Sequence, residues 1–182
     1  MRILSATALL LMAQYAFAAP LDTAHSQIGF TLTQMSSPMD GEFKHFSGNA
    51  TLDLKHANTG RADITISTAS IHLPTAQANS MAQSSDWFNV AKFPSAHFVA
   101  SSIKPLGGNR YQFNGTLTIK GVTHPVSAPF TASQQGALTM VEGTLPVSRL
   151  SYKIGEGDWS DTDTVAETVQ IKFRIAVPAS SK

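Results

Sequence analysis

The sequence predicts an all-β domain of eight antiparallel strands, and two features of the 182-residue chain support this prediction. Apolar and polar residues alternate along several segments, which is the pattern of a strand with one buried and one wetted face. Short segments rich in Gly, Asn and Pro separate these segments, as expected where the chain reverses between neighbouring strands. Alternation does not distinguish a closed barrel from a two-sheet sandwich, because both folds bury one face of each strand.

The clearest strands lie in the middle of the chain, at residues 96–103, 110–119 and 122–130. They are rich in β-branched and aromatic residues, and in the second one the odd-numbered positions from Tyr111 to Ile119 share an apolar face. Reversals at residues 107–109 and 120–121 predict an antiparallel meander. Gly115 lies inside the middle strand, where we expect a bulge or the close approach of another backbone.

Five further segments show strand patterns, at residues 27–34, 42–54, 62–73, 137–147 and 168–177. Residues 35–41 hold Pro38 and the Asp40-Gly41 pair, and they predict the reversal between the first two of these, with the turn at Asp40-Gly41. Residues 75–89 break the alternation, and their composition predicts one short helix between strands. This helix would either cover one end of a barrel or serve as an ordinary surface crossover. Residues 151–163 are predicted to form a long loop.

The first 18 residues have the features of a secretory signal peptide. Met1 and Arg2 form a positive start, residues 3–13 form an apolar run, and Ala16-Phe17-Ala18 is a small-x-small cleavage site. The apolar run is shorter than the roughly 20 residues that a membrane-spanning helix needs. We therefore predict cleavage after Ala18, export, and a single mature domain over residues 19–182.

Charge and cysteine content exclude several classes of function. The chain has 13 basic and 12 acidic residues, and without Arg2 of the signal peptide the two signs are equal in number. A neutral domain without a basic cluster is a poor candidate for binding nucleic acid or an anionic membrane surface. The chain has no cysteine, which excludes both disulfide staples and thiol chemistry.

The sequence offers no catalytic or metal-binding motif, and we predict a protein that is not an enzyme. It has no nucleophile elbow, no His-Glu-x-x-His and no phosphate-binding glycine loop. The six histidines are scattered singly, without the spacing typical of a metal site. Four acidic residues surround Trp159, but their spacing does not match a calcium loop, which favours a solvated loop.

Several separated motifs resemble the YceI-like family of lipocalin-like, polyisoprenoid-binding proteins. They lie at residues 22–30, 46–48, 66–71, 86–98 and 115–126, in the family's order, and extend over essentially the whole predicted mature chain. The resemblance implies an eight-stranded lipocalin-like barrel with its polar face outside and its apolar face around a cavity. It also implies a periplasmic location.

The resemblance further implies a non-enzymatic carrier that holds an isoprenoid or an isoprenoid quinone as ligand and needs no cofactor. Buried methylene groups each contribute about 0.8 kcal/mol, so a long hydrocarbon can bind without directed polar contacts. The candidate cavity-lining residues are the apolar and aromatic side chains Ile28, Phe30, Phe46, Ile64, Ile66, Met81, Trp87, Phe88, Phe98, Phe113, Leu117, Trp159 and Phe173.

One departure from the family concerns the predicted helix. Family members often carry charged residues there, commonly an Arg and a His-Leu pair, whereas residues 76–83 of this chain are uncharged. If those charges contact a ligand headgroup, this chain is better suited to a neutral quinone than to a pyrophosphate.

Two other interpretations of the chain remain open. In the first interpretation, the cavity of the barrel is filled. The protein is then a partner module that binds a membrane b-type cytochrome or other redox protein through the acidic loop around Trp159. The second is an enzyme acting on a lipid or redox substrate, although the sequence shows no acid–base pair. A symmetric homodimer is compatible with each interpretation.

Overall fold

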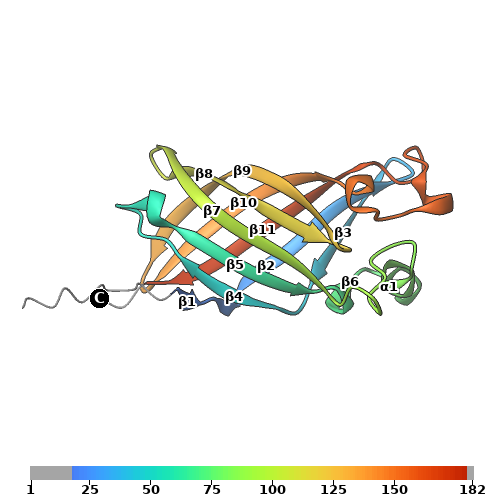
Figure 1. The fold of residues 1–182 in the computed structure, drawn as a ribbon, viewed down its shortest axis with the longest axis horizontal. Helices are drawn as coiled ribbons and strands as arrows, with labels where there is room; N and C mark the ends of the chain where they lie inside the picture. The colour runs from blue at the N-terminus through green and yellow to red at the C-terminus, as the bar shows by residue number, and fades with distance from the viewer. Residues whose placement is uncertain (1–17, 180–182) are drawn as a thin grey trace, which may run out of the picture.

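A computed structural model describes residues 18–179, and in it an antiparallel sheet closes into a barrel that carries a short helix at one end (Figure 1). The predicted signal peptide lies outside the described residues, apart from Ala18. The strands are β1 (Ala19–Pro20), β2 (Asp22–Gln34), β3 (Ser37–Phe43), β4 (Phe46–Thr51), β5 (Arg61–Ser67), β6 (Ile71–His72), β7 (Ser95–Gly107), β8 (Arg110–Ile119), β9 (Val122–Gln135), β10 (Leu138–Ser148) and β11 (Thr168–Pro178). The helices are α1 (Ala76–Gln83) and the 3₁₀ turns η1 (Ala57–Thr59), η2 (Thr68–Ser70), η3 (Leu150–Tyr152) and η4 (Gly157–Ser160).

The eleven strand segments correspond to the eight strands that the sequence predicts. Leu21 alone separates β1 from β2, Lys44 and His45 separate β3 from β4, and η2 separates β5 from β6. Along the wall, β2 pairs with β11 and β3, while β4 pairs with β1 and β5. Each interrupted run therefore continues along the same neighbours, and the sheet closes into a barrel whose pairing is interrupted between Leu21 and Ile28. The predicted eight-stranded antiparallel barrel is confirmed.

The meander β7–β8–β9 confirms the predicted central strands and explains the glycine inside them. Gly115 faces Ala100 on β7, and the register shifts between Ala100 and Ser102. A Cβ atom added to Gly115 would overlap the carbonyl oxygen of Val99. The close backbone approach predicted at this position is therefore present, together with an irregularity in the neighbouring strand.

The chain reverses within the predicted residues 35–41, but the predicted position of the turn at Asp40-Gly41 is wrong. The chain turns between β2 and β3 at Met35 and Ser36, which have φ values of 47° and 64°. Gly41 lies inside β3 opposite Phe30, and a Cβ atom there would collide with the Phe30 ring. The glycine makes room for this buried ring, a role that a short-range turn signal does not reveal.

The helix predicted near residues 75–89 is α1, and it ends earlier than the predicted segment. Thr75 caps its first turn, because the hydroxyl accepts a hydrogen bond from the backbone N–H of Ala78 at 3.1 Å. The Asn79 side chain accepts from the N–H of Leu73 at 2.8 Å and donates to the Leu73 carbonyl at 3.1 Å. These bonds fix α1 to β6, at the same end of the barrel as the loop between β10 and β11 (Figure 1).

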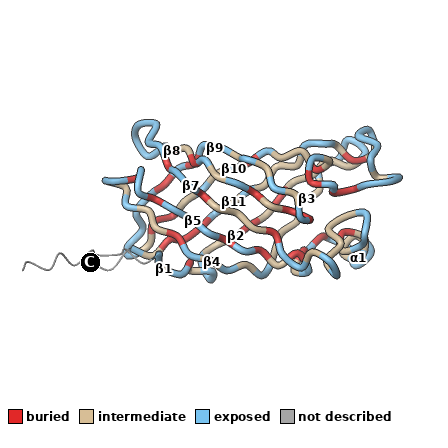
Figure 2. The backbone as a smooth tube through the Cα atoms, in the orientation of Figure 1, coloured by how far each residue is buried: buried red, intermediate tan, exposed pale blue. Residues whose placement is uncertain are grey.

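The core faces the inside of the barrel. On β8 Tyr111, Phe113, Leu117 and Ile119 are buried, and buried stretches alternate with exposed ones along the wall (Figure 2). A smaller cluster of Phe30, Ile71, Leu73 and Ala82 lies under α1. Within residues 18–179, no helix has the length and apolar character needed to cross a membrane.

Candidate ligand-binding cavity

An apolar space lies inside the barrel and is called the barrel cavity below. It measures about 130 Å³, whereas a single water molecule needs roughly 10–15 Å³ measured in the same way. Its walls are almost wholly apolar, and such cavities stay dry and accept apolar ligands. The lining side chains are Ile28, Ala50, Thr51, Leu52, Arg61, Ala62, Ile64, Ile66, Phe98, Ala100, Ile103, Phe113, Leu117, Phe130, Val141, Leu145, Ile171, Phe173, Ile175 and Val177.

Two smaller apolar cavities continue toward the helix end. The cap cavity measures about 90 Å³, lies against Phe30, Leu73 and Tyr152, and shares Ile171 with the barrel cavity. A third, the mouth cavity, measures about 50 Å³ and shares Leu32, Leu73, Ala82, Trp87 and Val165 with the cap cavity. Shared walls place the three cavities in sequence, from the mouth beside α1 to the interior of the barrel.

The structure places most of the predicted lining residues around these cavities. Ile28, Ile64, Ile66, Phe98, Phe113, Leu117 and Phe173 line the barrel cavity, Phe30, Trp87 and Phe88 line the cap cavity, and Met81, Trp87 and Trp159 line the mouth cavity.

Phe46 differs from the other candidates. It packs against the edge of the core and lines a separate, partly polar depression with Lys44 and His45. Between Leu21 and Ile28 the pairing of the first two strand runs is interrupted, and this depression lies at the interruption. A participation of any of these residues in ligand binding stays a prediction.

Several lining residues were not among the sequence-based candidates. Val141 and Leu145 lie on β10, and Ile171, Ile175 and Val177 lie on β11, where the alternation carried a detectable signal. Arg149, which lines the cap cavity, had no such signal, because an arginine after a strand is ordinarily a surface residue.

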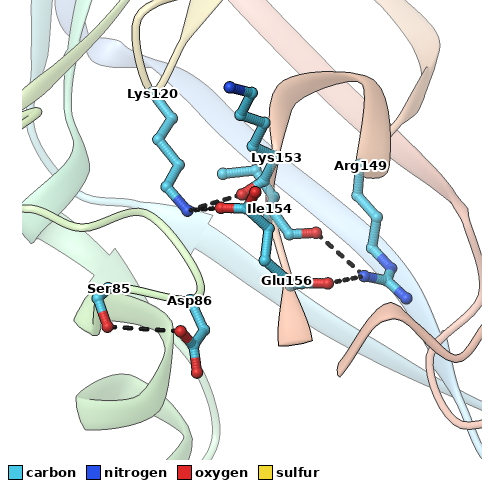
Figure 3. A network of polar contacts seen from close by, with 8 residues as sticks. Ser85, Asp86, Lys120, Arg149, Lys153, Ile154 and Glu156 are labelled. Atoms are coloured by element: carbon cyan, nitrogen blue, oxygen red, sulfur yellow. Dashed lines mark hydrogen bonds and ion pairs between the residues drawn. The ribbon is translucent and has the colours of Figure 1, made fainter. Parts of the chain in front are cut away.

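Arg149 organises the loop that covers the cap cavity. The side chain is only 2% exposed, and its guanidinium donates to the backbone carbonyls of Ile154, Gly155, Val165 and Ala166 at 2.7–3.1 Å (Figure 3 shows two of these bonds). Burial lowers the pKa of Arg149, while the charges of Glu167 and Asp161 act in the opposite direction. Four carbonyl oxygens thus take the place of a carboxylate partner. By binding all four, the guanidinium joins the two ends of the loop.

A second buried cation ties this loop to the β8–β9 turn. The Lys120 ammonium donates to the Lys153 carbonyl at 2.7 Å and to a Glu156 carboxylate oxygen at 2.9 Å (Figure 3). The Asp86 carbonyl accepts from the backbone N–H groups of Gly155 and Glu156 at 2.8 and 2.9 Å. The segment that carries Trp87 is therefore fixed directly to the loop.

Trp87 has an unusual environment at the junction of the cap and mouth cavities. The centroid of its ring lies 5.7 Å from the centroid of the Trp159 ring. The same centroid lies 6.0 Å from Cζ of Arg149. Its indole Nε1 is the one buried side-chain nitrogen or oxygen without a hydrogen-bond partner among residues 18–179. In the same part of the chain, no group of three or more His, Asp or Glu side chains is placed to hold a metal ion.

A closed antiparallel barrel around an apolar cavity, with one end covered by a helix and a loop, defines a lipocalin-like barrel. Comparison with known proteins gives its family. The profile of the YceI-like domain matches residues 20–177, and the chain belongs to the YceI-like family.

Individual relatives agree with this assignment. Protein YceI of Salmonella newport is 34% identical over 113 residues, which are 62% of this chain and 59% of that protein. The UPF0312 protein plu2095 of Photorhabdus laumondii is 36% identical over 128 residues, which are 68% of this chain and 66% of that protein. In each case the match spans less than two thirds of the relative.

Solved structures show the same fold over more of the chain. The crystal structure of Burkholderia cenocepacia BcnA has a TM-score of 0.84 and 40% identity, covering 86% of this chain and 99% of BcnA. A polyisoprenoid binding domain from Saccharophagus degradans has a TM-score of 0.71 and 16% identity, covering 90% of this chain and 99% of that domain. At this low identity, the second comparison supports the fold alone.

Proposed function

We propose that the protein is an exported, periplasmic carrier that holds an isoprenoid lipid or isoprenoid quinone in the barrel cavity and performs no catalysis. The observation that carries the proposal is the apolar barrel cavity, continued by two smaller apolar cavities toward the helix end. Long apolar chains gain about 0.8 kcal/mol for each buried methylene group, so these walls suit a polyprenyl tail.

Two further findings support this assignment. The chain belongs to the YceI-like family, and a structural neighbour with the same barrel is described as a polyisoprenoid binding domain. The predicted signal peptide accounts for export to the periplasm. The Arg149 guanidinium is bound to backbone carbonyls of its own loop, and the walls of the barrel cavity are almost free of polar groups.

The decisive experiment is native mass spectrometry of the mature protein purified from its own periplasm, followed by organic extraction of whatever co-purifies. We expect a mass excess that corresponds to a polyprenyl lipid or quinone, and the same spectrum reports whether the protein is a monomer or a dimer. A bare mass, with no uptake of an added apolar ligand, would contradict the carrier function. It would favour a filled barrel that acts as a partner module of a membrane cytochrome.

A further inference from the structure

We propose that the end of the barrel that carries α1 docks onto the surface of a phospholipid bilayer through an uncharged rim. The rim consists of residues 32–39, which include the turn between β2 and β3, and residues 73–85, which include α1. Both segments lie at the same end of the barrel (Figure 1). The inference adds a partner to the proposed function, and the role of the contact, transfer of the apolar ligand, rests on that function.

The rim differs from the rest of the chain in its charge. Asp, Glu, Lys and Arg make up 14% of the chain, yet residues 32–39 and 73–85 contain none of them and no histidine. Moving a charged group out of water has a large free-energy cost, whereas uncharged groups approach a lipid surface without it. The two segments of the rim are therefore suited to contact with a bilayer.

Met35 is the apolar side chain that projects furthest from packing at this end. It is 75% exposed, and Leu106 at 41% is the only other exposed large apolar residue within residues 18–179. Single exposed apolar residues are common, but Met35 also has a φ of 47°, in the left-handed region that methionine rarely adopts. Its backbone N–H donates to the Thr164 carbonyl at 2.9 Å, which fixes the turn. Packing within the protein does not explain this exposed side chain, and contact with lipid would bury it.

Half-buried apolar side chains surround the opening next to Met35. Met39 on β3, Met81 on α1 and Trp159 on η4 line the mouth cavity. Met39 and Ala78 pack against the same buried cluster under α1, which places the two segments of the rim side by side. Methionine is unbranched and adapts to irregular apolar surfaces, and tryptophan suits a boundary between water and lipid. The rim therefore offers an adaptable apolar surface around the mouth cavity.

The rim is continuous with the apolar interior of the barrel. The mouth cavity shares Leu73 and Ala82 with the cap cavity, and the cap cavity shares Ile171 with the barrel cavity. A bilayer in contact with the rim lies at the beginning of this series of cavities. An apolar molecule can then move between bilayer and protein without exposing its surface to water, which is unfavourable.

The acidic loop next to the rim selects the kind of lipid. Asp158, Asp161 and Asp163 are exposed on both sides of Trp159 in the sequence, and the exposed Lys153 offsets only part of their charge. Anionic headgroups would repel these carboxylates, and salt would screen the repulsion. The rim therefore favours phospholipids without net charge.

The test is flotation of the mature protein with vesicles of phosphatidylcholine, which has no net charge. We expect the unmodified protein to float with the vesicles, and Met35→Asp to weaken partitioning at least about tenfold, because a carboxylate resists desolvation. Aspartate tolerates a positive φ better than methionine, so this turn should remain folded. Met35→Leu keeps an apolar side chain and should stay within about twofold of the unmodified protein.

Leu106→Asp is the matched control for Met35→Asp. Leu106 is the other exposed large apolar residue, and it lies near the turn between β7 and β8, at the opposite end of the barrel (Figure 1). The same new charge at this position should leave partitioning unchanged. Equal losses in the two variants would overturn the assignment of the contact to the rim.

Lipid composition and hydrogen exchange test the contact on the unmodified protein. Replacing about half of the phosphatidylcholine with anionic phosphatidylglycerol should weaken flotation at low salt, and added salt should restore it. Phosphatidylcholine vesicles should slow backbone hydrogen exchange at residues 35–37 and leave residues 107–109 unchanged. No flotation with phosphatidylcholine would overturn the proposal and leave the rim to a protein partner, and stronger flotation with the anionic vesicles would overturn the choice of lipid.

A transfer measurement separates this inference from the proposed function. The ligand is squalene, an isoprenoid hydrocarbon, supplied in phosphatidylcholine vesicles. We expect Met35→Asp to take up squalene at least about tenfold more slowly, while its equilibrium affinity for squalene changes less than about twofold. Protein that binds squalene but does not float with vesicles would overturn the docking surface and leave the carrier function standing. Protein that floats but binds no squalene would overturn the carrier function and leave the docking surface standing.

Discussion

The carbonyl oxygen of Val99 occupies the space in which a side chain at Gly115 would begin. The two residues lie on adjacent strands of the barrel wall, next to the register shift between Ala100 and Ser102. The wall therefore closes at this point only because position 115 has no Cβ atom. The contact is with backbone, which relaxes less readily than the end of a flexible side chain.

Gly115→Ala is accordingly expected to destabilise the barrel by about 1–3 kcal/mol, the usual cost of forcing extra atoms into a packed region. Urea denaturation followed by circular dichroism measures the change. Gly29→Ala is the control, because the nearest obstacle to its Cβ is the Gly41 carbonyl oxygen at 3.2 Å. A stability loss no larger at Gly115 than at Gly29 would show that the two strands can separate at little cost.

Arg149→Lys tests whether the loop over the cap cavity depends on the branched shape of the guanidinium. Lysine keeps the charge but cannot reach four carbonyl oxygens in a fixed plane, so some of these buried acceptors lose their partner. We expect a loss of about 2–4 kcal/mol in the free energy of unfolding, since each unsatisfied buried group costs about 1–3 kcal/mol. Chemical denaturation at neutral pH measures it.

The same substitution at Arg174 provides the comparison for Arg149. Arg174 is an exposed strand residue whose Nε lies 2.9 Å from a Glu142 carboxylate oxygen. Exposed ion pairs contribute about 0–1 kcal/mol, so Arg174→Lys should stay within that range. Similar losses for the two variants would mean that charge alone, and not the guanidinium geometry, holds the loop.

The fold was largely predictable because a barrel buries one face of every strand, and alternation reports that face directly. Tyr111 and Phe113 are buried as the pattern indicated. A reversal within residues 35–41 was predictable, but its position at Met35 and Ser36 was not, since neither residue type favours the positive φ that both adopt. Gly41 was predicted to be a turn residue, but it is a strand residue. A glycine is present there because the ring of Phe30, on the neighbouring strand, fills the space of a side chain.

The candidate site was predictable where it coincides with the apolar face of a strand and not elsewhere. Leu145 and Val177 share the pattern of the residues that were named, so a full listing of inward positions would have included them. Arg149 belongs to the site through carbonyls up to 17 residues further along the chain. No short-range sequence pattern indicates that the loop after β10 folds back so that its carbonyls surround Arg149.

Phe113→Glu tests the barrel cavity itself as the place where an apolar ligand binds. Phe113 is buried and lines the cavity, so a carboxylate there would face an apolar tail without a partner. We expect squalene binding to be lost, as measured by titration of the folded variant. Asn114→Glu introduces the same charge on the exposed face of the same strand and should leave binding unchanged. Retained binding in a folded Phe113→Glu variant would place the ligand outside the barrel cavity.

The acidic loop gives a prediction for pH dependence through Asp161. Hydrogen bonds from the Thr164 hydroxyl at 2.7 Å and the Asp163 backbone N–H at 3.0 Å lower the pKa of Asp161 below 3.8. Because the folded pKa is the lower one, its contribution to stability is present above pH 3.8 and disappears as the pH falls through the folded value. Asp161→Asn should therefore be less stable than the unmodified protein at neutral pH, with the difference shrinking in acid. Denaturation curves at several pH values measure this difference, and Thr164→Val should reduce it by removing the principal donor. A difference that is the same at neutral and acid pH would show that the Asp161 carboxylate does not hold the loop.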